Sequence, residues 1–470
     1  MKRKLFDPIA VTGILFLLLF LALAFHIGSY SYQHRMELMS NSYNQRQKIF
    51  LAQNTRGSIY AADDSVLAKT ETEANGTEKR VYPYGELFAH AVGYADFGKS
   101  GIEAYANYYL VRSDISLREK MACEAGHKKN PGNDVYTTLQ PRIQKAALDA
   151  LGGERGAILL TEVKTGKILA MVSRPDFDPN IIAQTWKRMK EEDKNTQLLN
   201  RATIGLYPPG STFKIVTALA YLREHDNKYQ DYQYDCRGFF SIGKDTIRCF
   251  HGERHGHVNF MTSFALSCNS SFANIGVHLD RGGFQRTLHS LLFGQPLPYD
   301  LPYSNSYAKV NKDTTDADLM QVAIGQGTTL MTPLHLNMIT SAIANGGTLW
   351  KPYFVTDVKN ADGERIRSFA PENEGQLLGS TEAEIMRSLM ADVVEEGTGR
   401  GLRGLSYTAA GKTGSAEYSS LTKDSHAWFT GFAPAQNPEV AITVILENAG
   451  TGGTVAVPVA RQVLDAYFRR

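Results

Sequence analysis

The chain has 470 residues, enough for two domains and a membrane anchor, and its 43% hydrophobic and 21% charged residues are typical of globular proteins. The net charge of +2 gives no general attraction to nucleic acid, and four cysteines exclude a disulfide-dense scaffold. We find no zinc-finger, Walker or dinucleotide-binding fingerprint, and we expect no nucleic-acid partner and no cofactor.

The N-terminus predicts a membrane anchor. Residues 2–4 are all basic, and they precede an apolar run over residues 9–27 that contains no Asp, Glu, Lys or Arg. Its length nearly matches the roughly 20 residues that cross the hydrocarbon core as a helix. We predict a single transmembrane helix over residues 8–28, with residues 1–7 in the cytoplasm and the rest of the chain outside it. A signal peptide cleaved after residues 22–24 is the alternative, although the apolar run is long for one.

Residues 29–135 are polar, with short mixed segments and several glycines and asparagines. Beyond the stretch 31–52 no long helical period is visible. We expect a small, partly β pedestal (dimerisation-like) domain that holds the rest of the chain away from the membrane.

Residues 136–470 predict a second, larger domain in which hairpins at both ends surround a helical middle. That order is typical of an α+β fold with helices packed on an antiparallel sheet. The expected elements are a helix at 143–151, strands at 157–160, 168–172, 426–432 and 440–446, and a closing helix at 455–468.

A serine followed three residues later by a lysine occurs at Ser211, Ser241, Ser306 and Ser420. Only Ser211 follows a Pro-Pro-Gly stop and opens an apolar helix. In that position Lys214 lies beside the hydroxyl, where burial would make it a base, and the helix N-terminus offers N–H groups to a developing oxyanion. The alternative for an isolated match is a helix-capping serine beside a lysine that reaches solvent.

Two other short motifs each occur twice. Lys-Thr-Gly begins at Lys164, in a predicted two-strand turn, and at Lys412, where small neighbours would let a substrate backbone lie along a strand. Ser-x-Asn begins at Ser42, near the anchor, and at Ser267, in the globular part. We select the later copy of each. Together the motifs Ser211–Lys214, Ser267–Asn269 and Lys412–Gly414 form the combination that marks penicillin-binding proteins and β-lactamases.

Over its whole length the sequence resembles class B penicillin-binding proteins. The main matches are LYPPGSTFK at 206–214, GKTGSAE at 411–417 and AWF at 427–429, with others at 56–59, 98–103, 200–202, 325–327, 332–334 and 344–347. Two positions depart from the family pattern. Residues 61–64 read Ala-Ala-Asp-Asp where Asp-Arg-Asn-Gly is usual, and Ser415 replaces a common threonine but keeps the hydroxyl.

The resemblance implies a serine-type peptidoglycan D,D-transpeptidase that cross-links stem peptides and is covalently inhibited by β-lactam antibiotics. Ser211 would attack the carbonyl between the two terminal D-alanines and form an acyl-enzyme. Lys214 would take the serine proton, which requires a pKa well below the usual ~10.4. Ser267 would relay a proton to the leaving amine, and Asn269 would orient Lys214.

The resemblance also implies a binding strand for the substrate. Lys412 would supply positive charge near the terminal carboxylate, and Thr413, Gly414 and Ser415 would bind the substrate backbone and carboxylate. The N–H groups of Ser211 and Ser415 would form the oxyanion hole.

Other functions use overlapping residues. A D,D-carboxypeptidase would have the same site with water as acceptor, and a β-lactamase would need a general-base glutamate that we do not identify. A non-enzymatic β-lactam sensor would need a signalling domain, for which residues 1–7 leave no room. Residues 29–135 are too few for a glycan-polymerising domain, so the resemblance implies a separate polytopic SEDS-type glycosyltransferase as partner.

The cysteines leave several interpretations open. Cys236 and Cys249 flank a predicted hairpin and could pair outside the cytoplasm or remain free. Cys268 is expected to be a small packing residue. A metal site is a further alternative, against an ordinary polar loop, and its candidate ligands are Cys249, His251, His255 and His257. We assign no metal ligand.

Overall fold

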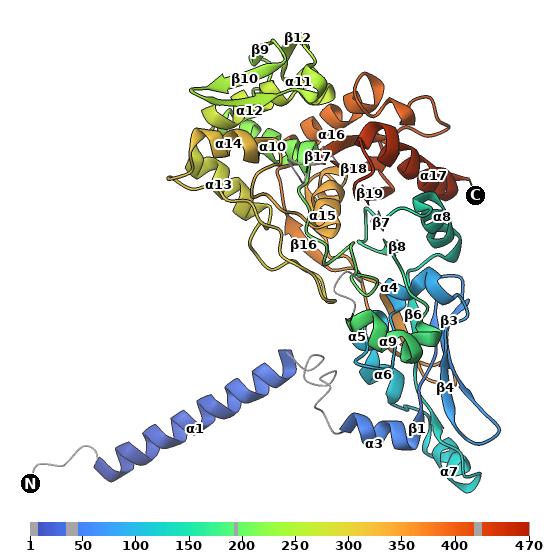
Figure 1. Ribbon diagram of the computed structural model, residues 1–470. Coiled ribbons are helices and arrows are strands. Elements are labelled where there is room, and N and C mark those ends of the chain that lie inside the picture. The colour runs from blue at the N-terminus through green and yellow to red at the C-terminus, as the bar shows by residue number, and fades with distance from the viewer. Residues whose placement is uncertain (1–7, 34–45, 192–195, 418–424, 470) are drawn as a thin grey trace, which may run out of the picture.

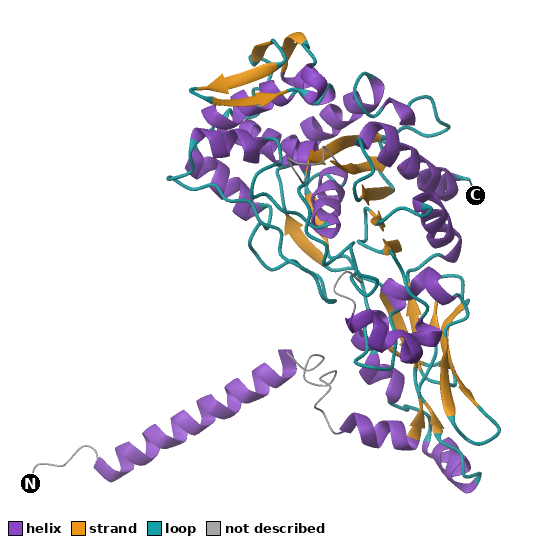
Figure 2. Ribbon diagram, in the orientation of Figure 1, coloured by secondary structure: helices purple, strands orange, loops and turns teal. Residues whose placement is uncertain are grey.

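A computed structural model describes residues 8–33, 46–191, 196–417 and 425–469. The protein combines an N-terminal helix, a pedestal and a larger part in which helices surround a sheet (Figures 1 and 2). The expected α+β architecture is therefore confirmed.

Helix α1 (Pro8–Gln33) contains the predicted anchor. Its 26 residues extend about 39 Å, which exceeds the ~30 Å hydrocarbon core. Its large apolar side chains are exposed, so no described part of the protein covers them. Among the described residues it is the one helix long and apolar enough to cross a membrane. It is therefore compatible with a single-pass anchor.

The pedestal is built on a six-stranded sheet in the order β15-β14-β6-β2-β3-β4. A parallel pair, β1 with β5, and several short helices lie beside it. The strands are β1 (Asn54–Thr55), β2 (Ile59–Tyr60), β3 (Val66–Thr72), β4 (Glu78–Val81), β5 (Asn130–Pro131), β6 (Asp134–Thr137), β14 (Val355–Lys359) and β15 (Arg365–Ser368). The helices are α3 (Arg46–Gln53), α4 (Ala89–Val92), α5 (Gly101–Tyr105), α6 (Asn107–Val111) and α7 (Leu117–Ala125).

A buried ion cluster holds the pedestal helices to its sheet. Glu103 on α5 is fully buried and accepts hydrogen bonds from Arg56 Nε and Arg80 Nε, both at 2.7 Å. Burial alone would raise the pKa of Glu103, but the two guanidinium groups hold it below its ordinary value. The cluster gives a structural reason for two of the family-like segments, 56–59 and 98–103.

The pedestal sheet takes strands from two distant parts of the chain. β14 pairs antiparallel with β6, with Lys359 opposite Asp134. Just before β14, Tyr353 donates its N–H to Gly166 O at 3.1 Å and accepts from Ile168 N at 2.9 Å. Backbone pairing thus crosses the boundary predicted at residue 135, and the division into domains 29–135 and 136–470 stays a prediction.

The larger part contains a five-stranded antiparallel sheet in the order β17-β18-β19-β7-β8. Its strands are β7 (Gly156–Glu162), β8 (Ile168–Arg174), β17 (Ala410–Glu417), β18 (Ser425–Ala433) and β19 (Val440–Leu446). The four strands predicted from the sequence are confirmed within one or two residues at most ends. β17 lies at one edge of the sheet.

Helices cover both faces of this sheet, and the alternation of β19 shows how. Val440, Ile442 and Val444 join the cluster with α8 (Pro141–Leu151) and α17 (Val457–Phe468), whereas Ala441 and Ile445 join the cluster with α15 (Pro333–Ala344). Successive side chains of a strand point to opposite faces, so a strand covered on both sides is apolar throughout. The predicted closing helix is confirmed, although a π-helical turn at Gly452–Ala456 precedes it.

Most of the remaining elements form a helical region with small hairpins at the end of the molecule farthest from the pedestal, whereas α9 lies beside α4 and α5 of the pedestal (Figure 1). The helices are α9 (Ile182–Glu191), α10 (Lys214–Glu224), α11 (Phe260–Ala265), α12 (Asn269–His278), α13 (Arg281–Ser290), α14 (Asp316–Ala323) and α16 (Ser380–Glu395). The strands are β9 (Gln233–Cys236), β10 (Phe239–Ile242), β11 (Asp245–Arg248), β12 (Gly256–Asn259), β13 (Thr348–Trp350) and β16 (Asn373–Gln376).

Candidate active site

The predicted nucleophile lies in a tight turn between the sheet and helix α10. Gly210–Phe213 form a 3-10 turn, so Ser211 precedes the α-helix instead of opening it as the sequence suggested. Gly210, the first residue of this turn, has a φ of +53°, in the left-handed region that favours glycine. A Cβ at this position would lie 2.9 Å from Ser415 O, so glycine lets the turn approach β17 closely. Ser211 is half-buried, and Lys214, three residues further on, is the first residue of α10.

Backbone hydrogen bonds from distant motifs hold this turn. The indole Nε1 of Trp428, on β18, donates to Pro208 O at 3.0 Å. Gly210 N donates to Gly325 O at 2.9 Å. These contacts explain why the family-like segments 325–327 and 427–429 accompany the serine motif.

Glu447, directly after β19, is a site-supporting residue that the sequence analysis missed. Its Oε1 accepts hydrogen bonds from the Arg201 guanidinium and the Tyr207 hydroxyl, both at 2.7 Å. Arg201 is almost fully buried, and the cluster ties the segment before the nucleophile to the sheet. An isolated glutamate after a strand belongs to no motif, and no sequence signal could have found it.

Lys214 is fully buried beneath the nucleophile turn. Its Nζ donates to Ser267 O at 2.6 Å, Asn269 Oδ1 at 2.7 Å and Ser267 Oγ at 3.2 Å. Burial lowers the pKa of Lys214 to about 7. This is the direction that a proton-accepting role for Lys214 requires, and it leaves a large fraction of the amine neutral at neutral pH.

Ser267 lies between two lysines. Its Oγ accepts hydrogen bonds from Lys214 Nζ at 3.2 Å and from Lys412 Nζ at 2.9 Å. The residue has φ of +57°, in the left-handed region, which costs a non-glycine residue roughly 1–3 kcal/mol and is enriched at functional sites. In this conformation the Ser267 hydroxyl lies between the amines of Lys214 and Lys412.

Lys412 and Thr413 lie on the edge strand β17. Lys412 is fully buried, and burial together with the charge of Lys214 lowers its pKa well below the ordinary value. Besides the bond to Ser267, its Nζ donates to Thr413 O at 3.1 Å. The hydroxyls of Thr413 and Thr398 lie 2.5 Å apart.

Gly414 and Ser415 bring β17 against the nucleophile turn. A Cβ on Gly414 would lie 2.9 Å from Pro209 O and 3.2 Å from Thr212 N. The Ser415 hydroxyl accepts the N–H of Gly452 at 3.2 Å. The predicted substrate-binding residues therefore lie on β17, the strand that contacts the turn of Ser211. Their roles in binding stay predictions.

The rejected motif copies lie elsewhere. Ser241 is on the exposed hairpin β10–β11, where its hydroxyl lies 2.8 Å from that of Thr246. Ser306 is buried and accepts the N–H of Thr332 at 3.1 Å. Lys164 lies in the turn between β7 and β8. Ser42 and Ser420 lie outside the described residues.

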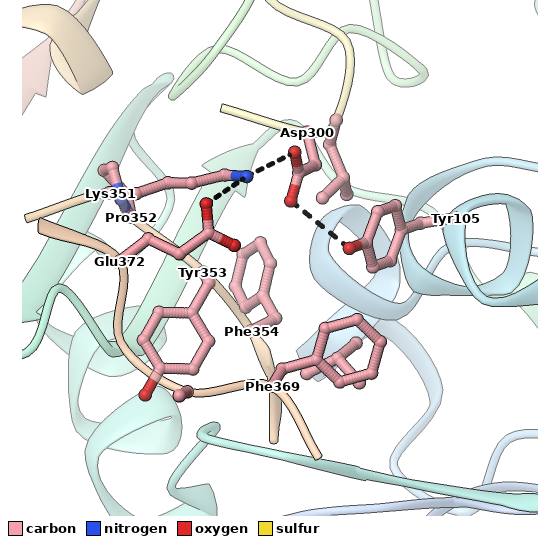
Figure 3. Close-up of a pocket in the computed structure, with 11 residues that line it drawn as sticks. Tyr105, Asp300, Lys351, Pro352, Tyr353, Phe354, Phe369 and Glu372 are labelled. Atoms are coloured by element: carbon pink, nitrogen blue, oxygen red, sulfur yellow. Dashed lines mark hydrogen bonds and ion pairs between the residues drawn. The ribbon is translucent and has the colours of Figure 1, made fainter. Parts of the chain in front are cut away.

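A separate pocket lies at the junction with the pedestal (Figure 3). Lys351 Nζ lies 2.8 Å from Asp300 and 3.3 Å from Glu372, and the Tyr105 hydroxyl donates to Asp300 Oδ2 at 3.2 Å. Phe354 and Phe369 supply an apolar wall. None of the predicted site residues lines this pocket. Its hydrogen bond between Tyr105 and Asp300 joins α5 to the larger part, so we interpret the pocket as part of a structural contact.

Two models of known protein families match the chain. The model of the penicillin-binding protein transpeptidase domain matches residues 156–465. That of the penicillin-binding protein A dimerisation domain matches residues 56–135.

Individual relatives and solved structures belong to the same group of proteins as these family models. The chain is 31% identical over 460 residues to the peptidoglycan D,D-transpeptidase PbpA of Mycolicibacterium smegmatis, covering 92% of this chain and 93% of that protein. It is 32% identical to the peptidoglycan D,D-transpeptidase MrdA of Acinetobacter baumannii, covering 83% of this chain and 66% of that protein. The ceftriaxone acyl-enzyme complex of penicillin-binding protein A from M. tuberculosis superposes with a TM-score of 0.82 at 29% identity, covering 90% of this chain and all of that one. The chain therefore belongs to the class B penicillin-binding proteins.

Proposed function

We propose that this protein is a peptidoglycan D,D-transpeptidase that uses Ser211 as its nucleophile. The observation that carries the proposal is the position of Ser267 Oγ between the buried amines of Lys214 and Lys412, beside the turn that presents Ser211. This arrangement supplies a base, a proton relay and a positive charge around one half-buried hydroxyl.

In the acylation step, the neutral amine of Lys214 takes the proton of Ser211 as Oγ bonds to the carbonyl carbon between the two terminal D-alanines. The N–H groups of Ser211 and Ser415 are proposed to stabilise the oxyanion. Ser267 then gives its proton to the leaving nitrogen and is reprotonated from Lys214, the C–N bond breaks, and D-alanine departs. Because Ser267 Oγ already accepts from both lysines, its own hydrogen is free to point at the leaving group.

Lys412 and Thr413 are proposed to bind the carboxylate of the terminal D-alanine, and Asn269 to orient Lys214 through their 2.7 Å hydrogen bond. An amine from a second stem peptide then attacks the acyl-enzyme. The new amide is the cross-link, and the proton lost by the amine returns to Ser211 through Lys214.

β-Lactam antibiotics are proposed to acylate the same serine. The solved structures of the M. tuberculosis relative include acyl-enzyme complexes with ceftriaxone, imipenem and penicillin G. A β-lactam ring offers a strained amide in place of the D-alanyl-D-alanine bond, so ring opening on Ser211 would leave a persistent adduct.

We also propose the topology predicted from the sequence, with residues 1–7 in the cytoplasm, α1 in the membrane and the remaining chain outside. Protease added to spheroplasts should digest the chain beyond α1. Recovery of a mature N-terminus at Phe25 would instead identify α1 as a cleaved signal peptide.

The experiment that tests transpeptidation combines the full-length protein, lipid-linked precursor and a polytopic SEDS-type glycosyltransferase, the partner we propose. After muramidase digestion, cross-linked dimeric muropeptides should appear, and penicillin should abolish them. Free D-alanine with only monomeric tetrapeptides, while the partner still makes glycan, would instead assign a D,D-carboxypeptidase. A Ser211→Ala control reports any cross-linking from other sources.

A further inference from the structure

Three exposed arginines gather beside the Ser267–Asn269 motif, in the region of strands β9–β12 (Figure 1). Arg237 follows β9, Arg248 ends β11, and Arg254 precedes β12. Together they form a surface that we call the arginine rim. The proposed catalytic steps assign no role to these three residues.

A buried group of side chains brings the arginines together. Each arginine is the immediate sequence neighbour of one member of this group, which consists of Cys236, Cys249 and His255. Sγ of Cys236 lies 3.7 Å from Sγ of Cys249 and 3.3 Å from Nδ1 of His255. The cysteines are free thiols, so no disulfide joins these segments in the structure. The arginine rim therefore starts from one small area of the backbone.

Gly238 is the point at which the three arginines meet. It follows Arg237, and its carbonyl accepts the N–H of Cys249, the residue after Arg248, at 2.9 Å. A Cβ on Gly238 would lie 3.3 Å from Cγ of Arg254, so the stem of that arginine packs against the glycine. The three side chains therefore leave the backbone around a single residue.

The arginine rim borders the catalytic group. Asn269 donates from Nδ2 to Arg248 O at 3.1 Å, and its Oδ1 accepts from Lys214 Nζ at 2.7 Å. One side chain therefore separates the backbone of Arg248 from the proposed base. Ile247 is buried, and successive side chains of a strand point to opposite faces, so the Arg248 side chain lies on the exposed face of β11.

The positive charge of the arginine rim is not neutralised within the part of the chain that the structure describes. There, none of the three guanidinium groups forms an ion pair or a hydrogen bond. Glu253, which lies next to Arg254 in the chain, faces His255 at 3.7 Å instead. A surface of one sign attracts ligands of the opposite sign, and a guanidinium binds a carboxylate through two parallel hydrogen bonds.

We propose that the arginine rim binds carboxylates of the donor stem peptide and favours donors in which these groups are free over donors in which they are amidated. Stem peptides carry such groups ahead of the D-alanyl-D-alanine end, on isoglutamate and, where the third residue is diaminopimelate, on that residue. The carboxylate of the terminal D-alanine is assigned to Lys412 and Thr413, so the rim binds a different part of the peptide. This inference rests on the proposed function, because it concerns the specificity of the same site.

Two penicillins that differ by one carboxylate test the arginine rim in the full-length protein. Carbenicillin is benzylpenicillin with a carboxylate on its acyl side chain, which corresponds to the residues before D-alanyl-D-alanine. Arg248→Ala should slow acylation by carbenicillin at least about tenfold and acylation by benzylpenicillin less than about twofold, because only the first loses a charge-assisted contact. Arg248→Lys should lie between wild type and Arg248→Ala, because lysine keeps the charge but not the planar fork. Intact-mass measurement over time gives both rates.

Lys244→Ala is the matched control. Lys244 is exposed in the turn of the same β10–β11 hairpin, roughly 13 Å from Arg248 along the strand, and the substitution also removes one positive charge. Its ratio of carbenicillin to benzylpenicillin rates should equal that of wild type. A ratio as low as that of Arg248→Ala would assign the effect to the general charge of the hairpin and overturn the rim.

The natural substrate gives a second test. Lipid-linked precursors with free or amidated stem-peptide carboxylates are supplied in turn to the protein and its proposed SEDS-type partner. Wild type should cross-link the free form faster, and high salt should weaken this preference because it screens exposed charges. A variant with all three arginines changed to alanine should cross-link both forms at similar rates.

The outcomes separate the arginine rim from the function on which it rests. An unchanged ratio of penicillin rates in Arg248→Glu, or a wild-type preference for amidated donors, would overturn the rim. Equal slowing by Arg248→Ala with both penicillins would give the arginine a structural role and also overturn it. A wild-type protein that forms no adduct with either penicillin would instead refute the proposed function.

Discussion

The two lysines that bond to the Ser267 hydroxyl lie so close together that they limit the charge of the site. Its hydrogen bonds to Lys214 and Lys412 mean that the two amines cannot be more than about 6 Å apart. At that separation, two positive charges repel by about 3 kcal/mol at an effective dielectric constant of about 20. Burial disfavours both charges further, so the doubly protonated pair is unstable near neutral pH.

This predicts the pH dependence of acylation. Because the pKa of Lys214 is lowered to about 7, the amine is charged and unable to accept a proton below that pH. The second-order rate of penicillin acylation should therefore rise as pH increases through about 7 and level off above it. Stopped-flow measurements over roughly pH 5 to 9 would test this. A rate that falls over this range would mean that charged Lys214 is the active form.

Ser211→Ala should abolish the covalent penicillin adduct while leaving the unfolding temperature nearly unchanged, because the hydroxyl has no hydrogen-bond partner among the described residues. Ser241→Ala is the matched control, since Ser241 begins another Ser-x-x-Lys motif but lies on an exposed hairpin. Intact-mass measurement and peptide mapping give the result. An adduct that survives in Ser211→Ala would move the nucleophile elsewhere.

Local motifs predicted which catalytic side chains would converge, because a serine and lysine three residues apart share a face and small residues mark a binding strand. The structure brings Lys214, Ser267, Asn269 and Lys412 into one hydrogen-bonded group. Glu447 could not be predicted, because its contacts to Arg201 and Tyr207 depend on how a distant strand folds against them.

At the level of elements, β17 combines two tasks. It is an edge strand of the five-stranded sheet, so one side of its backbone pairs with no described strand of that sheet. Its glycines let it lie against the nucleophile turn. An extended peptide can add to such an edge through main-chain hydrogen bonds, which would align the scissile carbonyl with Ser211.

Lys412→Ala should slow acylation about 100-fold, because loss of a preorganised contact to the developing charge costs roughly 3 kcal/mol. The unfolding temperature should change little by comparison. Lys164→Ala, in the other Lys-Thr-Gly copy, should react at the wild-type rate because that lysine lies in the β7–β8 turn. Equal acylation in both variants would contradict the assignment of the binding strand.

Periodicity predicted the main strands and helices well, because long apolar patterns leave little choice of structure. It predicted that Ser211 opens the α-helix, whereas a 3-10 turn over Gly210–Phe213 comes first and the α-helix begins at Lys214. It also began the closing helix at residue 455, whereas the π-helical turn there follows from the close approach of Gly452 to β17 and β18. Both differences come from contacts between elements.

At the scale of the whole molecule, the buried ions of the pedestal predict a stability effect. Glu103→Gln leaves Arg56 and Arg80 buried without a counter-charge, so the free energy of unfolding should fall by roughly 3–5 kcal/mol. Glu71→Gln, in an exposed pair with Lys69, should change it by less than about 1 kcal/mol. Chemical denaturation of the full-length protein measures the free energy of unfolding of both variants. Equal values for the two variants would contradict the proposed contribution of the cluster to stability.

Sequence patterns also predicted a pedestal, but not that β14 and β15 would complete its sheet. Each is a short strand with mixed polarity, and the pair joins the sheet only through β14, whose other partner, β6, is far away in the chain. Composition along the chain carries no signal for pairing between distant strands, so a boundary drawn from composition at residue 135 could not include β14 and β15.

The shared strand segment has a mechanical consequence. Tyr353 forms backbone hydrogen bonds with Gly166 and Ile168, and the residues that follow it pair with β6 in the pedestal sheet. The chain is therefore hydrogen-bonded on both sides of the junction and is not a flexible linker. Swivelling the two parts would shear several backbone hydrogen bonds at once. We therefore expect a rotation of the pedestal to be transmitted through this rigid junction to the five-stranded sheet, whose opposite edge strand carries Lys412.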